Sequence, residues 1–418
     1  MDTIYALSSG RPPAAIAVVR VSGPLAHGAA TRMAGQLPDA RHAAVRELRD
    51  PVSGERLDEA LVLRFDGPAS STGEDSVEFH CHGGRAVVDA VLRALGQLDG
   101  LREAEPGEFT RRAFENGRID LTEAEGLADL IAAETESQRK AALALAEGGL
   151  RKQLTEWQDR LLALSAAAER AIDYDEDDSA VDPSLTAGVG RLAADLGDWL
   201  ERPRVEPLKD GVRVVVAGPP NAGKSSLVNV IAGTERAIVT DVPGTTRDHI
   251  EVPLAIAGIP ILLIDTAGLR ATDDMVEAIG VERASRLVTA ADILLWLGEP
   301  GVAPPGAILV HTKADVSGLA PEGSVAVSAK TGAGLADLLG LVGEAARALL
   351  PDEGAIALNR RQAGLLAEAR DALATPTHDA VLVAENLRLA RGAFDRLTGR
   401  AGVEDVLDAL FSRFCLGK

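Results

Sequence analysis

The sequence predicts an α/β domain inserted into an all-α domain, with a smaller domain of strands and helices in front of both. Three observations lead to this prediction. Between Leu208 and about Leu350, segments typical of strands and helices alternate, which is the pattern of a parallel sheet with flanking helices. Helical patterns precede this stretch, from Thr122 onward, and resume after Pro351. Residues 1–116 instead combine β-branched apolar runs with one amphipathic segment.

Length, charge and cysteine content restrict the class of protein. A chain of 418 residues is too long for one hydrophobic core. The formal net charge of −20 argues against a broad electrostatic coating of nucleic acid, without excluding a local basic patch or a basic partner. Two distant cysteines, no long apolar run and an N-terminus unlike a signal peptide lead us to expect a cytoplasmic protein without membrane attachment.

In the first domain we expect a helix over 85–98 and strands over 14–21, 59–65 and 75–82. The chain then becomes helical, and Thr122 with Glu125 is expected to form the capping box of the first helix. Further helices are expected over 184–201, 358–374, 379–398 and 403–414. The predicted boundaries are 1–116, 117–207, 208–350 and 351–418, where the second and fourth segments form one helical domain.

Gly218–Ser225 reads Gly-Pro-Pro-Asn-Ala-Gly-Lys-Ser and fits the phosphate-binding pattern G-x-x-x-x-G-K-[ST]. Apolar, β-branched residues precede it, as in a buried strand, and the residues after it can begin a helix. In that context backbone N–H groups and the positive end of the helix dipole bind phosphate. We expect Lys224 to reach the outer phosphates and the Ser225 hydroxyl to bind magnesium. The alternative is a glycine-rich turn that fits by chance.

Further segments complete a phosphate and metal site. Asp241–Asp248 offers Thr246 as a second magnesium ligand. Asp265 ends an apolar run, so it is expected at the carboxyl end of a strand near the metal. Gly268, three residues later, can present its N–H to the γ-phosphate.

Two more segments point to guanine. Asp315, in Thr312-Lys-Ala-Asp315, can accept hydrogen bonds from guanine N1 and N2, which adenine does not supply. Ser328-Ala-Lys330 ends another strand and can hold the edge of the base. The order of these segments is that of a GTPase. The residues predicted to bind GTP are Asn221, Ala222, Gly223, Lys224, Ser225, Ser226, Thr240, Asp241, Val242, Pro243, Gly244, Thr245, Thr246, Asp265, Thr266, Ala267, Gly268, Thr312, Lys313, Asp315, Ser328, Ala329 and Lys330.

The sequence departs from the usual GTPase pattern in two places. Thr312 stands where the guanine motif normally has Asn, and Leu269 stands where Ras-like enzymes have the water-orienting Gln. No arginine finger is identifiable to neutralise the charge that develops on the γ-phosphate. Asn221 offers another solution, because its amide oxygen can bind a monovalent cation where a finger would lie.

Four segments together resemble the MnmE family of tRNA modification GTPases, also called TrmE. They are Asn221-Ala-Gly-Lys-Ser-Ser226, Gly244-Thr-Thr-Arg-Asp248, Asp265-Thr-Ala-Gly-Leu-Arg270 and Phe414-Cys-Leu-Gly-Lys418. The resemblance covers nearly the whole chain, and the terminal Cys-x-Gly-Lys is its most specific element because Era-like and other GTPases lack it. It implies an α/β plus all-α fold, with a Ras-like P-loop GTPase domain inserted into a helical domain and an α+β tetrahydrofolate-binding domain in front.

The resemblance also implies an activity and partners. Members hydrolyse GTP in a potassium-dependent reaction that dimerisation of the nucleotide domains activates. They form homodimers through their N-terminal domains and join the FAD protein MnmG in a heterotetramer. The two proteins place a 5-carboxymethylaminomethyl-type group on the wobble uridine of certain tRNAs, with a one-carbon unit from 5-formyl- or methylene-tetrahydrofolate.

Carried onto this sequence, the resemblance assigns further residues. The potassium ligands would be Asn221, Thr240, Val242 and Thr245. Glu277 would orient the attacking water, although spacing alone favours an ordinary surface glutamate. Cys415 would act in modification, where a buried small side chain is the default interpretation. The folate site would draw on Arg20, Glu78, Arg118 and Lys418, and Arg118 stands where many members have Lys.

Other interpretations remain open at this point. Glu78, His80 and His82 alternate on one strand face, where a solvated face is favoured over a metal site because no further His/Cys cluster accompanies them. At the level of function, a ribosome-assembly GTPase with RNA-docking domains is the runner-up, disfavoured by the acidic balance and the Cys-x-Gly-Lys end. A GTP-regulated aminomethyl transferase that acts on a protein is a third, weaker option.

Overall fold

The computed structural model describes residues 2–174, 183–237, 250–266, 287–316, 319–352, 354–377, 379–402, 404–414 and 417. The chain divides into two compact units, one formed by residues 1–128 with 395–418 and the other by residues 129–394. No helix among the described residues is long and apolar enough to cross a membrane.

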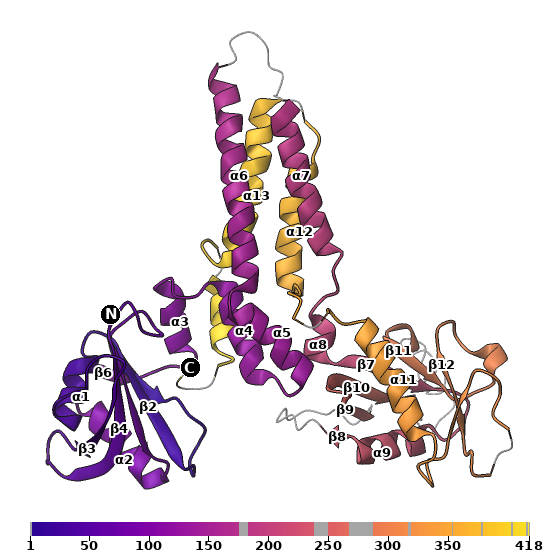
Figure 1. Cartoon of the computed structure of the whole chain (residues 1–418), viewed down its shortest axis with the longest axis horizontal. Helices are drawn as coiled ribbons and strands as arrows, with labels where there is room; N and C mark the ends of the chain where they lie inside the picture. Colours follow the sequence, from indigo (N-terminus) through magenta and orange to yellow (C-terminus); the bar gives the residue numbers. More distant parts are fainter. Residues whose placement is uncertain are drawn as a thin grey trace, which may run out of the picture. The chain divides into compact units, whose positions relative to one another are not determined.

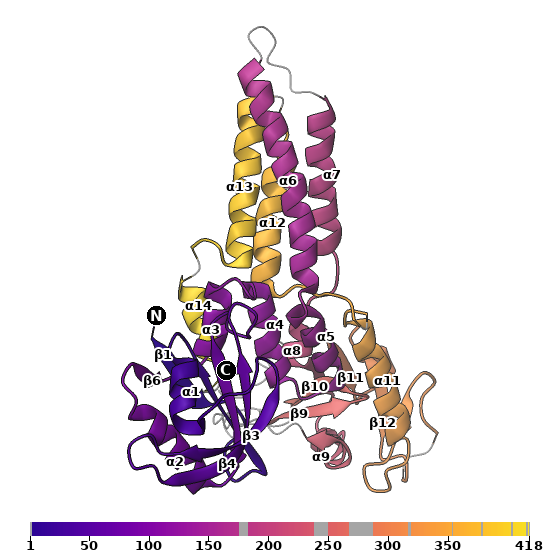
Figure 2. The ribbon, with the colours of Figure 1, turned by 60° about the vertical axis from the view of Figure 1, so that its left-hand side comes forward.

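The first unit contains a six-stranded sheet in the order β3-β4-β5-β2-β1-β6. All neighbours are antiparallel except β1 and β6, which run parallel. The helices α1 and α2 pack on one face of the sheet (Figure 2). Alternate strand residues on that face, such as Val19 and Phe79, form the core. The bounds are β1 Thr3–Leu7, β2 Ile16–Ser22, α1 Ala26–Ala34, β3 Ala43–Arg49, β4 Arg56–Phe65, β5 Ser76–His82, α2 Arg85–Gly96 and β6 Leu101–Glu103.

Helices from both ends of the chain complete the first unit. The helix α3 (Glu108–Glu115) places Phe109 on the other face of the sheet, against Ile4 and Ala6. The end of the chain, with α14 (Glu404–Phe411), packs on α3 and on the start of α4 (Leu121–Ala132) through an apolar cluster. Gly417 then lies against the end of β1, where a Cβ would overlap the carbonyl oxygen of Leu7.

The cap of α4 differs from the prediction. The side chain of Asp120 accepts from the backbone N–H of Glu123, and the side chain of Glu123 accepts from the N–H of Asp120. This reciprocal pair is the capping box, so the prediction of Thr122 with Glu125 is wrong by two residues. Thr122 is buried inside the first turn and donates its hydroxyl to Asp120, whose carboxylate is the stronger acceptor.

The second unit contains a helical bundle. The long helices α6, α7, α12 and α13 run side by side in Figure 1, with α5 at the base. Trp157 fixes their core, because its ring lies edge-on to Trp199 at 5.2 Å and stacks on Phe394 at 6.2 Å. The bounds are α5 Glu136–Ala146, α6 Gly149–Tyr174, α7 Pro183–Leu200, α12 Arg360–Ala374 and α13 Ala380–Thr398.

An α/β domain is inserted between α7 and α12. Its sheet has the order β13-β12-β11-β7-β10-β9-β8, parallel from β13 to β10 and antiparallel from there to β8. This architecture confirms the predicted fold class. The bounds are α8 Glu206–Asp210, β7 Val212–Ala217, α9 Lys224–Thr234, β8 Arg236–Ala237, β9 Ile250–Ile256, β10 Ile259–Asp265, β11 Ile293–Trp296, η2 Pro300–Val302, β12 Ile308–Thr312, β13 Val325–Val327 and α11 Leu335–Ala348.

Candidate functional site

The phosphate-binding loop lies between β7 and α9, as its sequence context predicts. Gly218, with φ 148°, passes so close to Leu297 that a Cβ would lie 3.0 Å from its carbonyl carbon. Asn221 (φ 62°) and Gly223 (φ 92°) are left-handed, which turns the loop toward the N-terminus of α9. The Ser225 and Ser226 hydroxyls lie in the exposed first turn of α9. A helix N-terminus behind a glycine-rich loop is suited to phosphate.

The side chain of Lys224 lies against the backbone of this loop. Its Nζ donates to the carbonyl oxygens of Gly218 at 2.9 Å and Pro219 at 2.8 Å, and the side chain is buried. The ammonium group therefore lies against the loop backbone, at the position from which it can also serve phosphate oxygens.

The base-recognition segment is tied to the same loop. The Thr312 hydroxyl donates to the carbonyl oxygen of Ala222 at 2.6 Å. The next residue, Lys313, itself left-handed with φ 59°, donates Nζ to the carbonyl oxygen of Asn221 at 3.1 Å. The last residue of β12 and the residue after it thus donate to two successive carbonyl groups of the phosphate loop.

Asp315 and Ser328 come together from different loops. The Ser328 hydroxyl donates to Asp315 Oδ1 at 2.8 Å and accepts from the N–H of Thr331. The Ser328 bond, followed by the backbone and the charge of Lys330, lowers the pKa of Asp315. The carboxylate is exposed and ionised, so it can accept hydrogen bonds from a base. These contacts bring the two predicted base-binding segments into one site.

Asp265 ends β10 beside β7, where it pairs in register with Val216, and it is buried. The hydroxyl of Thr266 donates to the carbonyl oxygen of Val216 at 2.7 Å. A serine hydroxyl on α9 and a carboxylate at this edge are hard oxygen donors of the kind that magnesium prefers. Several predicted residues lie outside the described part of the chain, namely Thr240, Asp241, Val242, Pro243, Gly244, Thr245, Thr246, Ala267, Gly268, Glu277, Cys415 and Lys418.

In the first unit the structure brings Arg20 and Glu78 together. They are cross-strand partners on β2 and β5, and the Arg20 guanidinium lies 2.9 Å from Glu78 Oε1. Arg20 also covers the ring of Phe109 at 5.6 Å, and His80 approaches the second oxygen of Glu78 at 3.3 Å. Both members of the pair are partly exposed, on the sheet face opposite α1 and α2. The pair therefore offers a cation and a carboxylate to a ligand.

Of the other two residues predicted to bind folate, Arg118 is among the described residues and Lys418 is not. Arg118 lies next to the loop 72–75, because a Cβ on Gly73 would be 3.2 Å from Arg118 Cγ. Lys418 is outside the described residues, but Gly417 lies beside Leu7 and Ser8. Ala6, on the same strand, is the register partner of Arg20. The described end of the chain thus lies next to the strand pair that carries Arg20.

The structure does not gather Glu78, His80 and His82 into a metal site. His82 turns to Asp58, with Nδ1 at 2.8 Å from the carboxylate. Among the described residues, the group of possible ligands close enough for an ion is a different one, His27, Asp66 and Asp75. Asp66 in that group already forms a two-bond pair with Arg64.

Sequence reasoning missed a buried charge cluster centred on Arg112 of α3. Its guanidinium donates to Asp2, to Glu74 at 3.2 Å and to Glu108 at 3.0 Å. Glu74 also accepts from Ser22, and Ser22 is hydrogen-bonded to Thr72. The cluster therefore fixes the loop 72–75, and so the surroundings of Arg118. An arginine on an amphipathic helix gives no signal of this role in a single sequence.

Comparisons with known proteins cover both units. Residues 3–118 match the family model described as GTP-binding protein TrmE N-terminus, and residues 121–415 match the MnmE helical domain. The tRNA modification GTPases MnmE of Erythrobacter litoralis and Rhizorhabdus wittichii are each 55% identical over 100% of this chain, covering 100% and 97% of their own lengths. The solved G domain of the T. maritima FeoB iron transporter covers 32% of this chain and 98% of its own at 28% identity, with a TM-score of 0.24. Full-length identity at this level, together with the two family models, shows that the chain belongs to the MnmE family of tRNA modification GTPases.

Proposed function

We propose that this GTPase is potassium-dependent and that, with MnmG, it places a 5-carboxymethylaminomethyl-type group on the wobble uridine of certain tRNAs. The observation that carries the proposal is the joining of the phosphate loop to the base-recognition segment through Thr312 and Lys313, in a chain whose relatives are tRNA modification GTPases. Homodimerisation, a heterotetramer with MnmG and a cytoplasmic location belong to the same proposal. So does the division into 1–116, 117–207, 208–350 and 351–418.

In the nucleotide domain, each residue has a role that its chemistry supports. The Asp315 carboxylate accepts from guanine, and Ser328 holds that carboxylate in place. Lys224 neutralises the β- and γ-phosphates, and the loop N–H groups bind their oxygens. Ser225 with Thr246 would hold magnesium, which supplies charge neutralisation on the phosphates.

Asn221 supports the potassium proposal. Its left-handed backbone exposes the side chain, while Lys313 holds its carbonyl group. Thr240, Val242 and Thr245 would supply the other oxygen ligands. A monovalent cation there would neutralise charge that an arginine finger neutralises elsewhere, and Glu277 would orient the water. Dimerisation of the nucleotide domains would close this site and activate hydrolysis.

In the N-terminal domain we propose a folate site around Arg20 and Glu78. A carboxylate can accept two hydrogen bonds from an aminopyrimidine such as that of a pterin, and a guanidinium can bind a polar edge or a glutamate tail. Arg118 and Lys418 would add positive charge, and Cys415 would act close to the transferred carbon of 5-formyl- or methylene-tetrahydrofolate. Cys81, by contrast, is buried, and burial raises its pKa to about 12, so we give it no chemical role.

The open face of the N-terminal sheet supports the homodimer. Ile16 and Val45 are 58% and 57% exposed there, and Leu61 is 37% exposed. Val45 and Leu61 are cross-strand partners, and Leu61 pairs in turn with His80. The exposed pair Val45–Leu61, with Ile16 on the same face of the sheet, offers apolar surface that a second copy of the chain can cover.

The direct test compares potassium with sodium and follows tRNA. GTP hydrolysis should rise in potassium and not in sodium, and deletion of the gene should remove the modified wobble uridine from tRNA nucleosides measured by mass spectrometry. Unchanged tRNA nucleosides in the deletion strain would exclude the proposed modification.

The Asn221→Ala variant distinguishes binding of the potassium ion from binding of the nucleotide. It should lose most of the potassium stimulation while it retains GDP affinity, because the phosphate loop binds GDP mainly through backbone N–H groups. Equal stimulation of the variant and the natural protein would refute the assignment of Asn221 as a potassium ligand.

A further inference from the structure

The two central strands of the inserted sheet connect the nucleotide edge with the opposite edge. β7 runs from Val212 into the phosphate loop, and β10 runs in parallel from Ile259 to Asp265. A strand of this length spans roughly 20 Å. Gly258, which precedes β10, therefore lies about that far from the phosphate site.

Gly258 forms the tip of a tight hairpin. β9 and β10 pair along their whole length, up to Ile256 opposite Ile259, which leaves a turn of two residues. Both turn residues have positive φ, 50° at Ala257 and 77° at Gly258, as in a type I′ turn. Such a turn matches the twist of its strands and leaves them little freedom. A shift at the Asp265 end would therefore move the tip with it.

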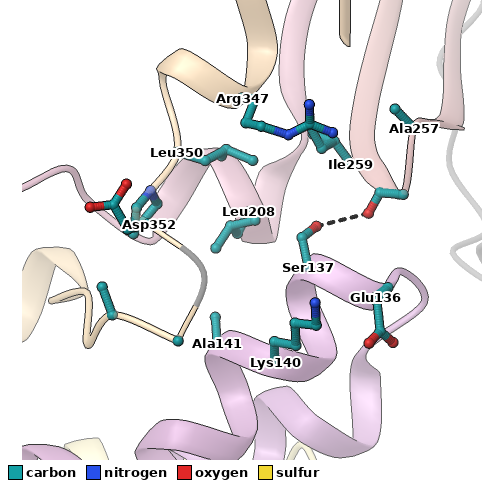
Figure 3. A pocket seen from close by; sticks show the side chains of 14 residues that line it. Glu136, Ser137, Lys140, Ala141, Leu208, Ala257, Ile259, Arg347, Leu350 and Asp352 are labelled. Atoms are coloured by element: carbon teal, nitrogen blue, oxygen red, sulfur yellow. Dashed lines mark hydrogen bonds between the residues drawn. The ribbon is translucent and has the colours of Figure 1, made fainter. Parts of the chain in front are cut away.

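The hairpin tip contacts the first turn of α5, as Figure 3 shows for Ser137. The Ser137 hydroxyl donates to the carbonyl oxygen of Gly258 at 2.9 Å, and the Ser137 backbone N–H reaches the same oxygen at 3.4 Å. N–H groups in the first turn of a helix have no partner inside the helix, so the carbonyl group supplies one. The contact attaches the hairpin to the helical bundle at a defined atom.

Residues of α5 and of the end of α4 also contact α8, the short helix that precedes β7. Gln138 donates Nε2 to the carbonyl oxygen of Leu208 at 2.8 Å, and Lys209 forms an ion pair with Asp129 at 2.7 Å. Leu208 and Lys209 lie in α8, directly before β7. Residues 129–138 therefore contact the segments that directly precede both strands, namely α8 before β7 and the Gly258 turn before β10.

A hollow adjoins the contact. It has a volume of about 600 Å³, counted with the solvent at its mouth, and its lining includes Ala141, Leu208, Arg347 and Leu350 (Figure 3). Beside this hollow the hairpin tip is held by hydrogen bonds to Ser137. Polar contacts of this kind contribute about 1 kcal/mol each, so a small displacement can break and remake them at low cost.

We propose that Ser137 is a positioning residue of the GTPase cycle: it senses the position of the β9–β10 hairpin and so couples the nucleotide at the Asp265 edge to helix α5. The proposal goes beyond the function proposed above and rests on it only for the binding of GTP and GDP at this site. In the absence of the Ser137 hydroxyl, the phosphate site is intact but the response of α5 to the nucleotide is weakened.

The test is hydrogen exchange of the full-length protein in GDP and in a non-hydrolysable GTP analogue, read by mass spectrometry. In the natural protein, amides of α5 should exchange about fivefold differently in the two nucleotides, which is the change expected from one net hydrogen bond. Ser137→Ala loses the hydroxyl but keeps the backbone N–H bond to Gly258, so it should reduce that difference, and Ser137→Thr should restore it. The matched control is Ser165→Ala, since the Ser165 hydroxyl donates to the carbonyl oxygen of Leu161 within its own helix, α6, and its loss should leave the difference intact.

Protection of the α9 amides from exchange reports nucleotide binding, because α9 follows the phosphate loop. It therefore distinguishes failure of the coupling proposal from failure of the proposed GTP binding. If GDP protects α9 but α5 exchanges alike in both nucleotides in the natural protein, the coupling proposal is wrong while GTP binding stands. A Ser137→Ala variant that keeps the full difference at α5 also overturns it. If neither nucleotide protects α9, nucleotide binding at this site fails, and the coupling that depends on it is overturned as well. GTP hydrolysis by Ser137→Ala at saturating GTP should stay within twofold of the natural rate, while modified nucleosides in tRNA from the variant strain fall.

Discussion

The nucleotide site and the N-terminal charge cluster hold their polar side chains in different ways. In the nucleotide site, Thr312 and Lys224 donate to backbone carbonyl groups of the phosphate loop. In the N-terminal domain, Arg112 is buried among the carboxylates of Glu74 and Glu108 and that of the partly exposed Asp2. The first arrangement uses neutral acceptors and the second uses compensating charges.

The difference determines what a substitution does. Loss of one hydrogen bond to a carbonyl group costs about 1 kcal/mol and leaves no charge behind. Loss of one member of a buried ionic cluster leaves the others uncompensated, which costs several times more. We therefore expect changes in the nucleotide site to act mainly on ligand affinity, and changes in the Arg112 cluster to act mainly on folding.

The largest effect is expected from Arg112→Gln. Glu74 and Glu108 would keep their charges in a partly buried place without the guanidinium, at a cost of roughly 3–5 kcal/mol. Urea unfolding of the intact chain, followed by circular dichroism, should show an early transition for the part containing the N-terminal sheet.

The control is Arg111→Gln on the same helix. Arg111 forms exposed ion pairs with Glu115 and Asp408, and such pairs contribute about 0–1 kcal/mol. If the two variants unfolded at the same urea concentration, the distinction between buried and exposed pairs in this domain would be lost.

A smaller loss of stability of the N-terminal domain is expected at acid pH. Burial raises the pKa of Glu108, but hydrogen bonds from Arg102, from the Glu105 N–H and from Arg112 outweigh it, so the pKa lies below the usual 4.5. A carboxyl whose pKa is lowered by folding stabilises the fold above its unfolded pKa and loses that contribution as pH falls through the folded pKa. Stability of the N-terminal domain should therefore decline below about pH 4.5, as measured by thermal unfolding across pH 3–7.

Glu108→Gln tests the assignment of this acid effect. The variant has no carboxyl group to titrate at this position, so it should be less stable at pH 7 and show a shallower decline below pH 4.5. A decline as steep as that of the natural protein would assign the acid effect to other carboxyl groups.

The arrangement of the described part of the candidate nucleotide site was predictable, because the residues proposed for it follow strand ends. Parallel strands end at one edge of a sheet, so the spacing of Lys224, Asp265 and Asp315 along the chain already implied a common site. The Thr312 hydroxyl was not predictable as a link to Ala222, since a departure from a motif does not say which atom takes over. The segments outside the described residues stay predictions.

The N-terminal domain was less predictable for a physical reason. Its edge strands β3 and β6 and its first strand β1 are short or lack a clear alternation, and none was predicted. Helical patterns were predicted after Thr122 without the positions of their breaks, which the structure places at 133–135 and 147–148 between α4, α5 and α6. Arg112 gave no signal because its partners lie 4 to 110 residues away.

The smallest change in free energy is expected from Thr312→Val, which tests one hydrogen bond of the nucleotide site through GDP affinity. Valine keeps the shape of threonine and removes the hydroxyl that holds Ala222, so GDP affinity should fall about fivefold, which corresponds to one net hydrogen bond. Thr312→Ser keeps the hydroxyl and should bind GDP almost normally, as titration calorimetry can show. Equal affinities of the Val and Ser variants would mean that the hydroxyl does not contribute to binding. Because neither substitution changes a charge, urea stability should stay within about 1 kcal/mol of the natural protein in both, in contrast to Arg112→Gln.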